Sequence, residues 1–448
     1  MALFGSSGAR GPVDGEMDPS LVARIARAAV DHLDADRVAI GRDARLTGPA
    51  LAAAATAGAA AGGADVERLG VSPTPAVQHH AEGAGVPAMV VTASHNPPTD
   101  NGIKLVDDDG GELAMDDYRA IEDRLDTGDV ASTDWSAFGA VERVIGVNRR
   151  YVEALAEELA TPALADADLA VVVDPANGPG ALTSPRLFRD LGCTVHTLNA
   201  DLDGRFPNRR PEPVPEALGD LADAVVALDA DLGVAHDGDA DRAVFVDETG
   251  SVLDGGAVFA ALAADAVGPD DVVVAGISAS KRLADVASEA GACLELTRVG
   301  AAHILTRVRE LEAGGTTVAI AGEENGGLVY PAHRLARDGA YTAGRFLHLV
   351  AERPASAVVE PYAGVAFRRR DLRYGDEAER AAMLERAERW ARDAPGRLRT
   401  VDGFRLDREE GWILVRASGT EPLVRVYAEA DDAATAGALI EEAVEAVA

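Results

Sequence analysis

The sequence predicts a multidomain protein of α/β layers that ends in a module of a different, α+β kind. Its 448 residues exceed what one hydrophobic core usually supports. One pattern also recurs: a short β-branched apolar run, a polar loop rich in glycine or asparagine, and then a helix-like stretch. Repeated units of this kind favour α/β layers with mostly parallel strands.

The recurring pattern places four strands and four loops in order along the chain. The apolar runs at 88–92, 169–173, 272–275 and 317–320 each precede such a loop. In open α/β sheets, ligands bind just beyond the carboxyl ends of the strands, which is where these loops fall. Each loop is therefore a candidate wall of a functional site.

The last part of the chain predicts an α+β module. Helix-like periodicity around 377–392 is followed by strand-like runs at 412–415 and 423–427 and by a final helix from Ala433. Joints near 144–149, 248–256 and 353–362 divide the whole chain into four expected domains, 1–145, 146–250, 251–355 and 356–448.

The charge is strongly negative and excludes some partners. There are 75 acidic and 42 basic residues, a net charge of −33, and Lys104 and Lys281 are the only lysines. Such a surface would repel nucleic acid, so we expect no nucleic-acid partner. The acids are dispersed along the chain, which favours a hydrated surface from a salt-loving source, with an acidic mesophile as the alternative.

The composition also argues against a membrane or secreted protein. No stretch is long and apolar enough to cross a bilayer, including the alanine-rich residues 51–61. The first residues lack the pattern of a signal peptide, and Cys193 and Cys293 form neither a metal spacing nor a disulfide framework. We therefore expect a cytoplasmic protein, as a monomer or homodimer.

The loop at 92–98 carries a candidate nucleophile. Ser94 follows a strand end in a proline-containing loop, with Lys104 ten residues later. A hydroxyl fixed in this way can carry phosphate, although a lone serine in a turn is more often a cap. Because nearly all basic residues of this chain are arginines, the presence of a lysine at position 104 indicates a group that must be able to lose its proton, which arginine cannot readily do. A Ser-His hydrolase is less favoured, because no G-x-S-x-G elbow is present and His95 would point elsewhere from an extended strand.

The loop at 236–242 carries a candidate cation site. Asp237, Asp239 and Asp241 alternate along it, and oxygen ligands alone favour Mg²⁺ or Ca²⁺ over zinc. An EF-hand is excluded because Arg242 occupies the position of the turn glycine and strand-like runs flank the loop. A solvated acidic turn is the alternative.

Two further loops offer polar groups for a ligand. Glu323 and Asn325 lie in a glycine-rich loop and could bind sugar hydroxyls, although a plain turn is the alternative. In the loop at 416–422, backbone N–H groups and hydroxyls could form an anion nest beside Arg416 and Arg425, unless these arginines are surface charges of a tight hairpin.

Taken in order, the loops at 92–98, 236–242, 322–327 and 416–422 resemble the phosphoserine, metal, sugar and phosphate loops of the α-D-phosphohexomutase family. The resemblance extends over essentially the whole chain, including residues 3–11 and 41–45. It implies three similar α/β domains with mixed sheets plus a C-terminal α+β domain, arranged around a central cleft. It also implies a phosphomutase that acts on a small sugar phosphate (glucosamine, mannose or glucose).

The family resemblance implies roles for individual residues. Ser94 would carry the phosphate, and Lys104 would transfer the proton. Mg²⁺ would be held by a phosphoserine oxygen and by Asp237, Asp239 and Asp241. A sugar 1,6-bisphosphate would be the intermediate and the activator. The remaining residues would line the site: Arg10, His95 and Arg242 at the reacting phosphate, Glu323 and Asn325 at the sugar, and Arg416, Ser418, Gly419, Thr420 and Arg425 at the distal phosphate.

Some positions depart from the family pattern. Ala301 stands where some relatives have histidine, Asn325 where many bacterial relatives have serine, Gly327 where they have histidine, and Ala417 where proline is frequent. The first three border the sugar, so they bear on substrate identity. A phosphopentomutase of the same fold, a metal-dependent sugar phosphatase and a non-catalytic acidic Ca²⁺-binding protein are the alternatives.

Overall fold

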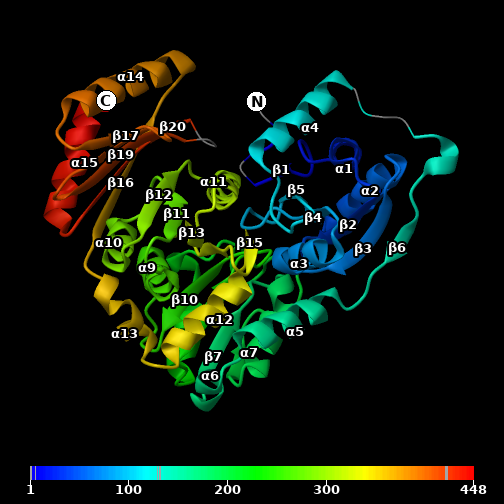
Figure 1. Cartoon of the computed structure of the whole chain (residues 1–448), viewed down its shortest axis with the longest axis horizontal. Coiled ribbons are helices and arrows are strands. Elements are labelled where there is room, and N and C mark those ends of the chain that lie inside the picture. Colours follow the sequence, from blue (N-terminus) through cyan, green and yellow to red (C-terminus); the bar gives the residue numbers. More distant parts are fainter. Residues whose placement is uncertain (1–2, 6, 129, 131–132, 419–421, 448) are drawn as a thin grey trace.

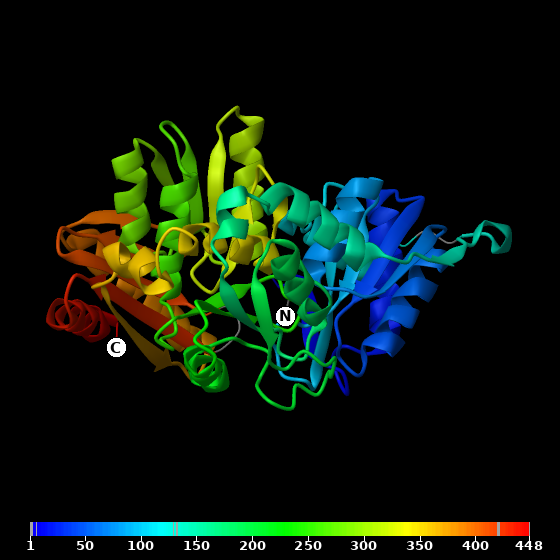
Figure 2. The ribbon, with the colours of Figure 1, turned by 90° about the horizontal axis from the view of Figure 1, so that it is seen from below.

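The computed structural model describes residues 3–5, 7–128, 130, 133–418 and 422–447. It contains four sheets in chain order, which Figure 1 and Figure 2 show side by side from the blue N-terminal part to the red C-terminal part. The first three sheets are mixed and belong to α/β/α domains, and the fourth is antiparallel. This arrangement confirms the fold class predicted from the sequence.

The first sheet has the strand order β1-β5-β4-β2-β3-β6. Strands β4, β2, β3 and β6 run parallel, whereas β5 and β1 run antiparallel to their neighbours. Its elements are β1 (Ala9–Pro12), α1 (Pro19–Leu33), β2 (Arg37–Arg42), α2 (Gly48–Ala61), β3 (Asp65–Val71), α3 (Thr74–Ala84), β4 (Ala88–Val91), β5 (Asp100–Val106), α4 (Met115–Thr127), the 3₁₀ turn η1 (Trp135–Ala137) and β6 (Val141–Arg143).

The second sheet has the order β10-β9-β7-β8, in which only β10 is antiparallel. Its elements are α5 (Val147–Leu159), α6 (Pro162–Asp166), β7 (Ala170–Asp174), η2 (Pro179–Leu182), α7 (Ser184–Asp190), β8 (Thr194–Thr197), η3 (Pro215–Ala217), α8 (Gly219–Ala227), β9 (Leu232–His236) and β10 (Ala243–Asp247).

The third sheet has the order β12-β11-β13-β14-β15, with a parallel part at β12, β11 and β13. Its elements are α9 (Gly255–Ala266), β11 (Val272–Gly276), α10 (Lys281–Ala290), β12 (Cys293–Thr297), α11 (Ala301–Ala313), β13 (Val318–Glu323), β14 (Gly327–Tyr330), β15 (Arg334–Arg337), α12 (Gly339–Val350), α13 (Ala355–Val359) and η4 (Glu360–Tyr362).

The fourth sheet, ordered β16-β20-β19-β18-β17, is covered on one face by α14 and α15. On its other face, Trp412 and Tyr427 pack against Ile277 of the third domain, and Arg405 donates to the Ile277 carbonyl oxygen at 2.6 Å. Its elements are β16 (Ala366–Arg373), α14 (Glu377–Asp393), β17 (Arg397–Arg399), β18 (Phe404–Asp407), β19 (Gly411–Ala417), β20 (Leu423–Ala430) and α15 (Ala433–Val447).

The buried sides of the parallel strands explain why their sequences read as continuous apolar runs. In the second sheet, Val171 and Val173 face one cluster of buried side chains, while Val172 faces another under α8. A strand covered on both faces needs apolar residues at every position. The same reasoning holds for Val272 and Val273 of β11, whose side chains belong to different clusters.

One expectation about the repeated units is wrong. The sequence predicted a helix after the Ser94 loop and after the Glu323 loop, but strands β5 and β14 follow instead and pair antiparallel with β4 and β13. A short loop can join antiparallel neighbours, whereas a parallel neighbour requires a crossover of about a dozen residues or more. The short loops therefore make these sheets mixed.

No helix among the described residues is long and apolar enough to cross a membrane.

Candidate active site

Ser94 is held in an unusual backbone conformation at the end of β4. Its φ is 49°, in the left-handed region, which places its side chain differently from that of an extended residue. The Thr92 hydroxyl accepts a hydrogen bond from the Ser94 amide at 2.8 Å and donates to Asp43 at 2.7 Å. The serine is completely buried, so its position is set by these neighbours and not by solvent.

Arg45 holds the Ser94 loop through hydrogen bonds to its backbone carbonyl oxygens. Its guanidinium, itself 0% exposed, donates to the carbonyl oxygens of Ser94 and Asn96 at 2.8 and 2.7 Å. It also donates to the carbonyl oxygens of Pro97 and Asp100 and forms an ion pair with Asp43. From the sequence, residues 41–45 were noted only as part of the family resemblance, and no role was predicted for Arg45.

We expect Arg45→Lys to disturb the Ser94 loop strongly. A lysine ammonium carries one point charge and cannot reproduce four carbonyl contacts from a planar fork. Turnover should fall at least about 10-fold, because each lost charged hydrogen bond is worth about 1.5–3 kcal/mol. Steady-state kinetics would measure this.

The control is Arg37→Lys, at the start of β2, where the arginine is half exposed and forms a single ion pair with Glu67. It should retain full turnover. Equal activity of Arg45→Lys and the control would refute the organising role.

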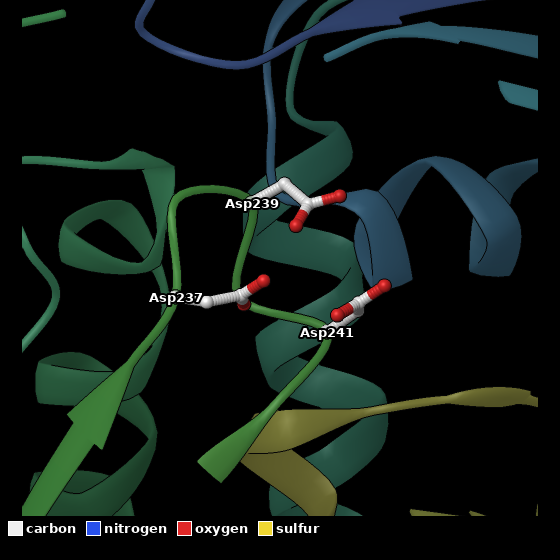
Figure 3. A group of neighbouring side chains, drawn as sticks. All are labelled: Asp237, Asp239 and Asp241. Carbon is white, nitrogen blue, oxygen red and sulfur yellow. The ribbon is translucent and has the colours of Figure 1, made fainter. Parts of the chain in front are cut away.

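The three aspartates of the second domain converge in the turn between β9 and β10 (Figure 3). One carboxylate oxygen from each of Asp237, Asp239 and Asp241 lies within 4.8 Å of the others, and all three residues are buried. Gly238 is required between them, because a Cβ at this position would lie 2.4 Å from the Ser94 carbonyl oxygen. The glycine thus lets the Ser94 loop and the aspartate loop touch.

Contacts between the first and second domains join the nucleophile to the aspartates. The Ser94 hydroxyl donates to Asp237 Oδ2 at 2.6 Å. The Lys104 ammonium donates to Asp239 Oδ2 and Asp241 Oδ2, each at 2.7 Å. Thr74 at the start of α3 also donates to Asp239 at 2.6 Å. The structure therefore brings together the serine, the lysine and the three carboxylates named from the sequence.

Charge within this cluster perturbs several pKa values. Burial, with the negative charges of Asp241 and Asp239, raises the pKa of Asp237 to about 8. Burial would also raise the pKa of Asp241, but the positive charges of Arg337 and Lys104 outweigh it and lower this pKa. Burial would lower the pKa of Lys104, but Asp239 and Asp241 outweigh it and raise this pKa.

The aspartate cluster fits a hard divalent cation. Asp239 Oδ1 and Asp241 Oδ1 are buried and have no hydrogen-bond partner among the described residues. Buried polar atoms without a partner are costly, and a cation would supply one. All the donors are carboxylate oxygens, which favours Mg²⁺ or Ca²⁺. This agrees with the cation site expected from the spacing.

His95 lies beside Ser94, which agrees with the position implied by the family resemblance but not with the alternation of an extended strand. Its Nδ1 is 3.2 Å from the Ser94 hydroxyl, because the left-handed conformation of Ser94 breaks the alternation of an extended strand. Arg242 donates to the same nitrogen at 3.2 Å. Burial and the charges of Arg242 and Arg10 lower the pKa of His95 to about 2, so it is a poor general base.

Arg337 of β15 is a site residue that the sequence analysis missed. It forms ion pairs with Asp241 at 2.8 Å and with Glu112 at 2.9 Å, and it donates to Ser7 at 3.0 Å. It thereby joins the third domain to the first and second. Arg10, on β1, has a lowered pKa because of burial and the nearby positive charge of Arg337, against the opposing effect of Asp239. No local motif surrounds Arg337 or Glu112 that could have identified them.

The proposed sugar loop lies between β13 and β14. Glu323 is one of the carboxylates that raise the pKa of Arg337 against the effect of burial, and Asn325 is exposed. A Cβ at Gly327 would lie 2.8 Å from Arg337 Cδ. The glycine found where many relatives have histidine thus leaves room for Arg337.

Arg416 and Arg425 lie directly opposite each other on β19 and β20. Like charges in this position are unfavourable unless anions compensate them. Arg416 forms an ion pair with Asp402 at 2.8 Å, and Asp402 also accepts from the Val299 amide of the third domain at 3.3 Å. Ser418 ends this part of the loop, and Gly419 and Thr420 lie outside the described residues.

A buried serine at a strand end donates a hydrogen bond to a cluster of three aspartates, and arginines from three domains lie around this cluster. This arrangement is typical of enzymes of phosphoryl transfer. Family models for phosphoglucomutase/phosphomannomutase match the chain along its length. They are the alpha/beta/alpha domain I at 1–131, domain II at 149–250, domain III at 254–363 and the C-terminal domain at 372–446. The chain belongs to this family, the α-D-phosphohexomutases, and is a phosphomutase.

Individual relatives agree with this assignment. The chain is 38% identical to a probable phosphoglucosamine mutase from Methanopyrus kandleri, covering 99% of this chain and 97% of the relative. It is 37% identical to a phosphoglucomutase/phosphomannomutase from Thermococcus kodakarensis, covering 96% and 94%. A crystal structure of a family protein from Burkholderia thailandensis superposes with a TM-score of 0.88 at 27% identity, covering 99% and 96%.

Proposed function

We propose that the protein interconverts the 1- and 6-phosphates of a hexose through a phosphoserine at Ser94 and a sugar 1,6-bisphosphate. The observation that carries this proposal is the hydrogen bond of 2.6 Å from the Ser94 hydroxyl to Asp237 of the aspartate cluster. A serine carrier needs a fixed position and nearby positive charge, and Arg45, Lys104 and Arg242 supply both.

The proposed reaction consists of two phosphoryl transfers in opposite directions. In the first, the bond between phosphorus and Ser94 Oγ breaks, and a bond to the free hydroxyl of the sugar monophosphate forms. The proton of that hydroxyl leaves as the bisphosphate is made. After the sugar turns over, its other phosphate returns to Ser94, and the released sugar oxygen takes up a proton. We assign the proton transfers to Lys104.

The charge on the moving phosphoryl group requires positive neighbours. Arg10, His95 and Arg242 lie around Ser94, the two arginines as cations and His95 as a neutral hydrogen-bonding group. Asp237, Asp239, Asp241 and a phosphoserine oxygen would hold Mg²⁺. The metal, when bound, would offset charge on the transferring group.

The other two loops would recognise the substrate. Glu323 and Asn325 are proposed to bind the sugar hydroxyls. Arg416, Ser418, Gly419, Thr420 and Arg425 are proposed to hold the phosphate that is not reacting. The cross-strand arginine pair supports this assignment, because a phosphate would relieve the repulsion between Arg416 and Arg425.

Among the sugars, glucosamine phosphate is our first candidate, followed by glucose and mannose phosphates. The probable phosphoglucosamine mutase of Methanopyrus kandleri supports this order. Domain limits at 1–145, 146–250, 251–355 and 356–448 remain a proposal. The cytoplasmic location, the salt-loving source and the monomeric or dimeric state remain predictions from the sequence.

A substrate panel tests the function. Purified protein with Mg²⁺ in high salt should convert glucosamine, glucose or mannose 1-phosphate to the 6-phosphate, monitored by ³¹P NMR, and a trace of the sugar 1,6-bisphosphate should stimulate it. Conversion of ribose 1-phosphate alone would indicate a phosphopentomutase. Inorganic phosphate released in step with substrate loss would indicate a phosphatase and overturn the proposal.

A further inference from the structure

A surface cavity of about 430 Å³ lies on the first domain, between α2 and the strands β2, β3 and β6. Figure 1 shows these elements together at the outer side of this domain. Three arginines line the cavity, Arg42, Arg68 and Arg143, against one acidic residue, Glu142. A concentration of positive charge is unexpected on a chain with a net charge of −33. None of the lining residues belongs to the Ser94 and aspartate cluster.

The register of the sheet brings two of these arginines together. Arg68 of β3 and Arg143 of β6 are directly opposite partners in a parallel pair, so their side chains lie on the same face. Like charges in this position are destabilising. No hydrogen bond or ion pair joins either guanidinium to another of the described residues, so the protein itself does not compensate this repulsion.

Arg42 brings a third charge from β2. Charge repulsion from Arg68 contributes to the lowered pKa of Arg42, after the larger effect of burial. A Cβ at Gly48, the first residue of α2, would lie 3.3 Å from Arg42 Cδ, so Arg42 packs against the start of this helix. The amino-terminal end of a helix adds further positive potential. The side chains of Arg42, Arg68 and Arg143 therefore give the cavity a positively charged lining.

The rest of the lining is apolar. Ile40 and Val141 contribute from the strands, and Pro49 and Ala52 from α2. Pockets of about 300–1,000 Å³ accommodate small ligands, whereas a bare anion needs no apolar wall. The combination of a cationic rim and an apolar wall fits a small molecule that carries a phosphate and a less polar body.

We propose that this cavity is a second, non-catalytic binding site for a phosphorylated small molecule. A phosphate bound between Arg68 and Arg143 accepts charged hydrogen bonds from both guanidinium groups and removes their mutual repulsion. The proposal is independent of the mutase reaction, because it rests on residues outside the Ser94 site.

The site is connected to the Ser94 loop by direct contacts. Arg42 donates to the Asp43 carbonyl oxygen at 2.9 Å. The Asp43 side chain binds Arg45 and Thr92, and both of these hold Ser94. These contacts link Arg42 of the cavity to the loop that carries Ser94.

Calorimetric titration at a fixed, moderate salt concentration tests the site, with three probes: inorganic pyrophosphate, ADP and glucose 6-phosphate. At least one probe should bind to a site with Arg68 and Arg143. The double variant Arg68→Gln/Arg143→Gln should raise its Kd at least tenfold. The control Arg119→Gln/Arg392→Gln, with the same charge change at exposed arginines, should leave the Kd unchanged. Addition of the probe should slow hydrogen exchange in β3 and β6.

The probes also separate this site from the substrate site. Binding that survives Arg416→Gln but is lost in the Arg68/Arg143 double variant supports the proposal, and the probe that binds most tightly identifies the ligand as a nucleotide, an inorganic polyphosphate or a sugar phosphate. Absence of saturable binding, or binding lost only in Arg416→Gln, overturns it. All these outcomes are binding measurements that involve no mutase assay. Failure of this proposal would therefore not contradict the proposed function.

Discussion

Ser94→Ala is expected to abolish mutase turnover and to leave the fold intact. Removal of a covalent nucleophile typically costs several orders of magnitude in kcat, and we expect a loss of at least about 10⁴-fold. The loss of one hydroxyl from a site held by Arg45 and Thr92 leaves the loop contacts to the Ser94 backbone in place. Circular dichroism and thermal unfolding should therefore match the parent.

The same variant tests the phosphoenzyme directly. Intact mass should show one phosphate on the active parent and none on Ser94→Ala, and peptide mapping should place it at residues 92–96. Dephosphorylated parent should be almost inactive until a trace of sugar 1,6-bisphosphate is added, and should then remain active. Ser136→Ala, a substitution at an exposed serine, is the control and should keep both phosphate and activity. Full activity of Ser94→Ala would make the mutase mechanism untenable.

Asp239→Asn is expected to weaken Mg²⁺ binding and to lower turnover by more than about 100-fold. Loss of a group that only hydrogen-bonds to a metal ligand lowers metal affinity or activity by about 10–100-fold. A larger loss is expected here because Asp239 is proposed as a direct ligand. The change also removes one of the two negative partners of the buried Lys104 ammonium. The amide is nearly the same size as the carboxyl group, and its oxygen can still accept the hydrogen bond from Thr74.

Mg²⁺ binding can be measured by calorimetry in the absence of substrate, which separates the metal site from catalysis. Asp116→Asn removes the same charge from an exposed position and should change neither binding nor turnover. If Asp239→Asn binds Mg²⁺ as tightly as the parent does, the metal assignment is wrong, whatever happens to activity.

The fold class and the aspartate cluster could be predicted because each depends on residues that are close together in the chain. A strand covered on both faces must be apolar throughout, as Val171 to Val173 show, and this is visible in the sequence. Asp237, Asp239 and Asp241 belong to one turn, so their spacing alone indicated a cation site, and the structure brings their carboxylates within 4.8 Å.

Predictions failed where the outcome depended on one backbone dihedral angle or on which strands pair. The alternation of an extended strand predicted that His95 points away from Ser94, whereas the family resemblance placed it at the reacting phosphate. The φ of 49° at Ser94 breaks this alternation, and His95 lies 3.2 Å from the Ser94 hydroxyl. The helix expected after the Ser94 loop is strand β5, because the loop is short and β5 pairs antiparallel with β4. Neither the dihedral angle nor the pairing has a signal in the local pattern of apolar residues.

The sequence by itself thus determined the class of fold and the spacing of the three aspartates, because these follow from burial and residue type over short segments. Only the tertiary structure decided which distant side chains meet. Arg45, in the loop after β2, supports the Ser94 loop. Arg337 of the third domain contacts Asp241 of the second domain and Glu112 of the first, and Arg68 lies opposite Arg143. Contacts of this kind depend on sheet register and on the close approach of domains at Gly238. The local sequence around each residue does not indicate either of these features.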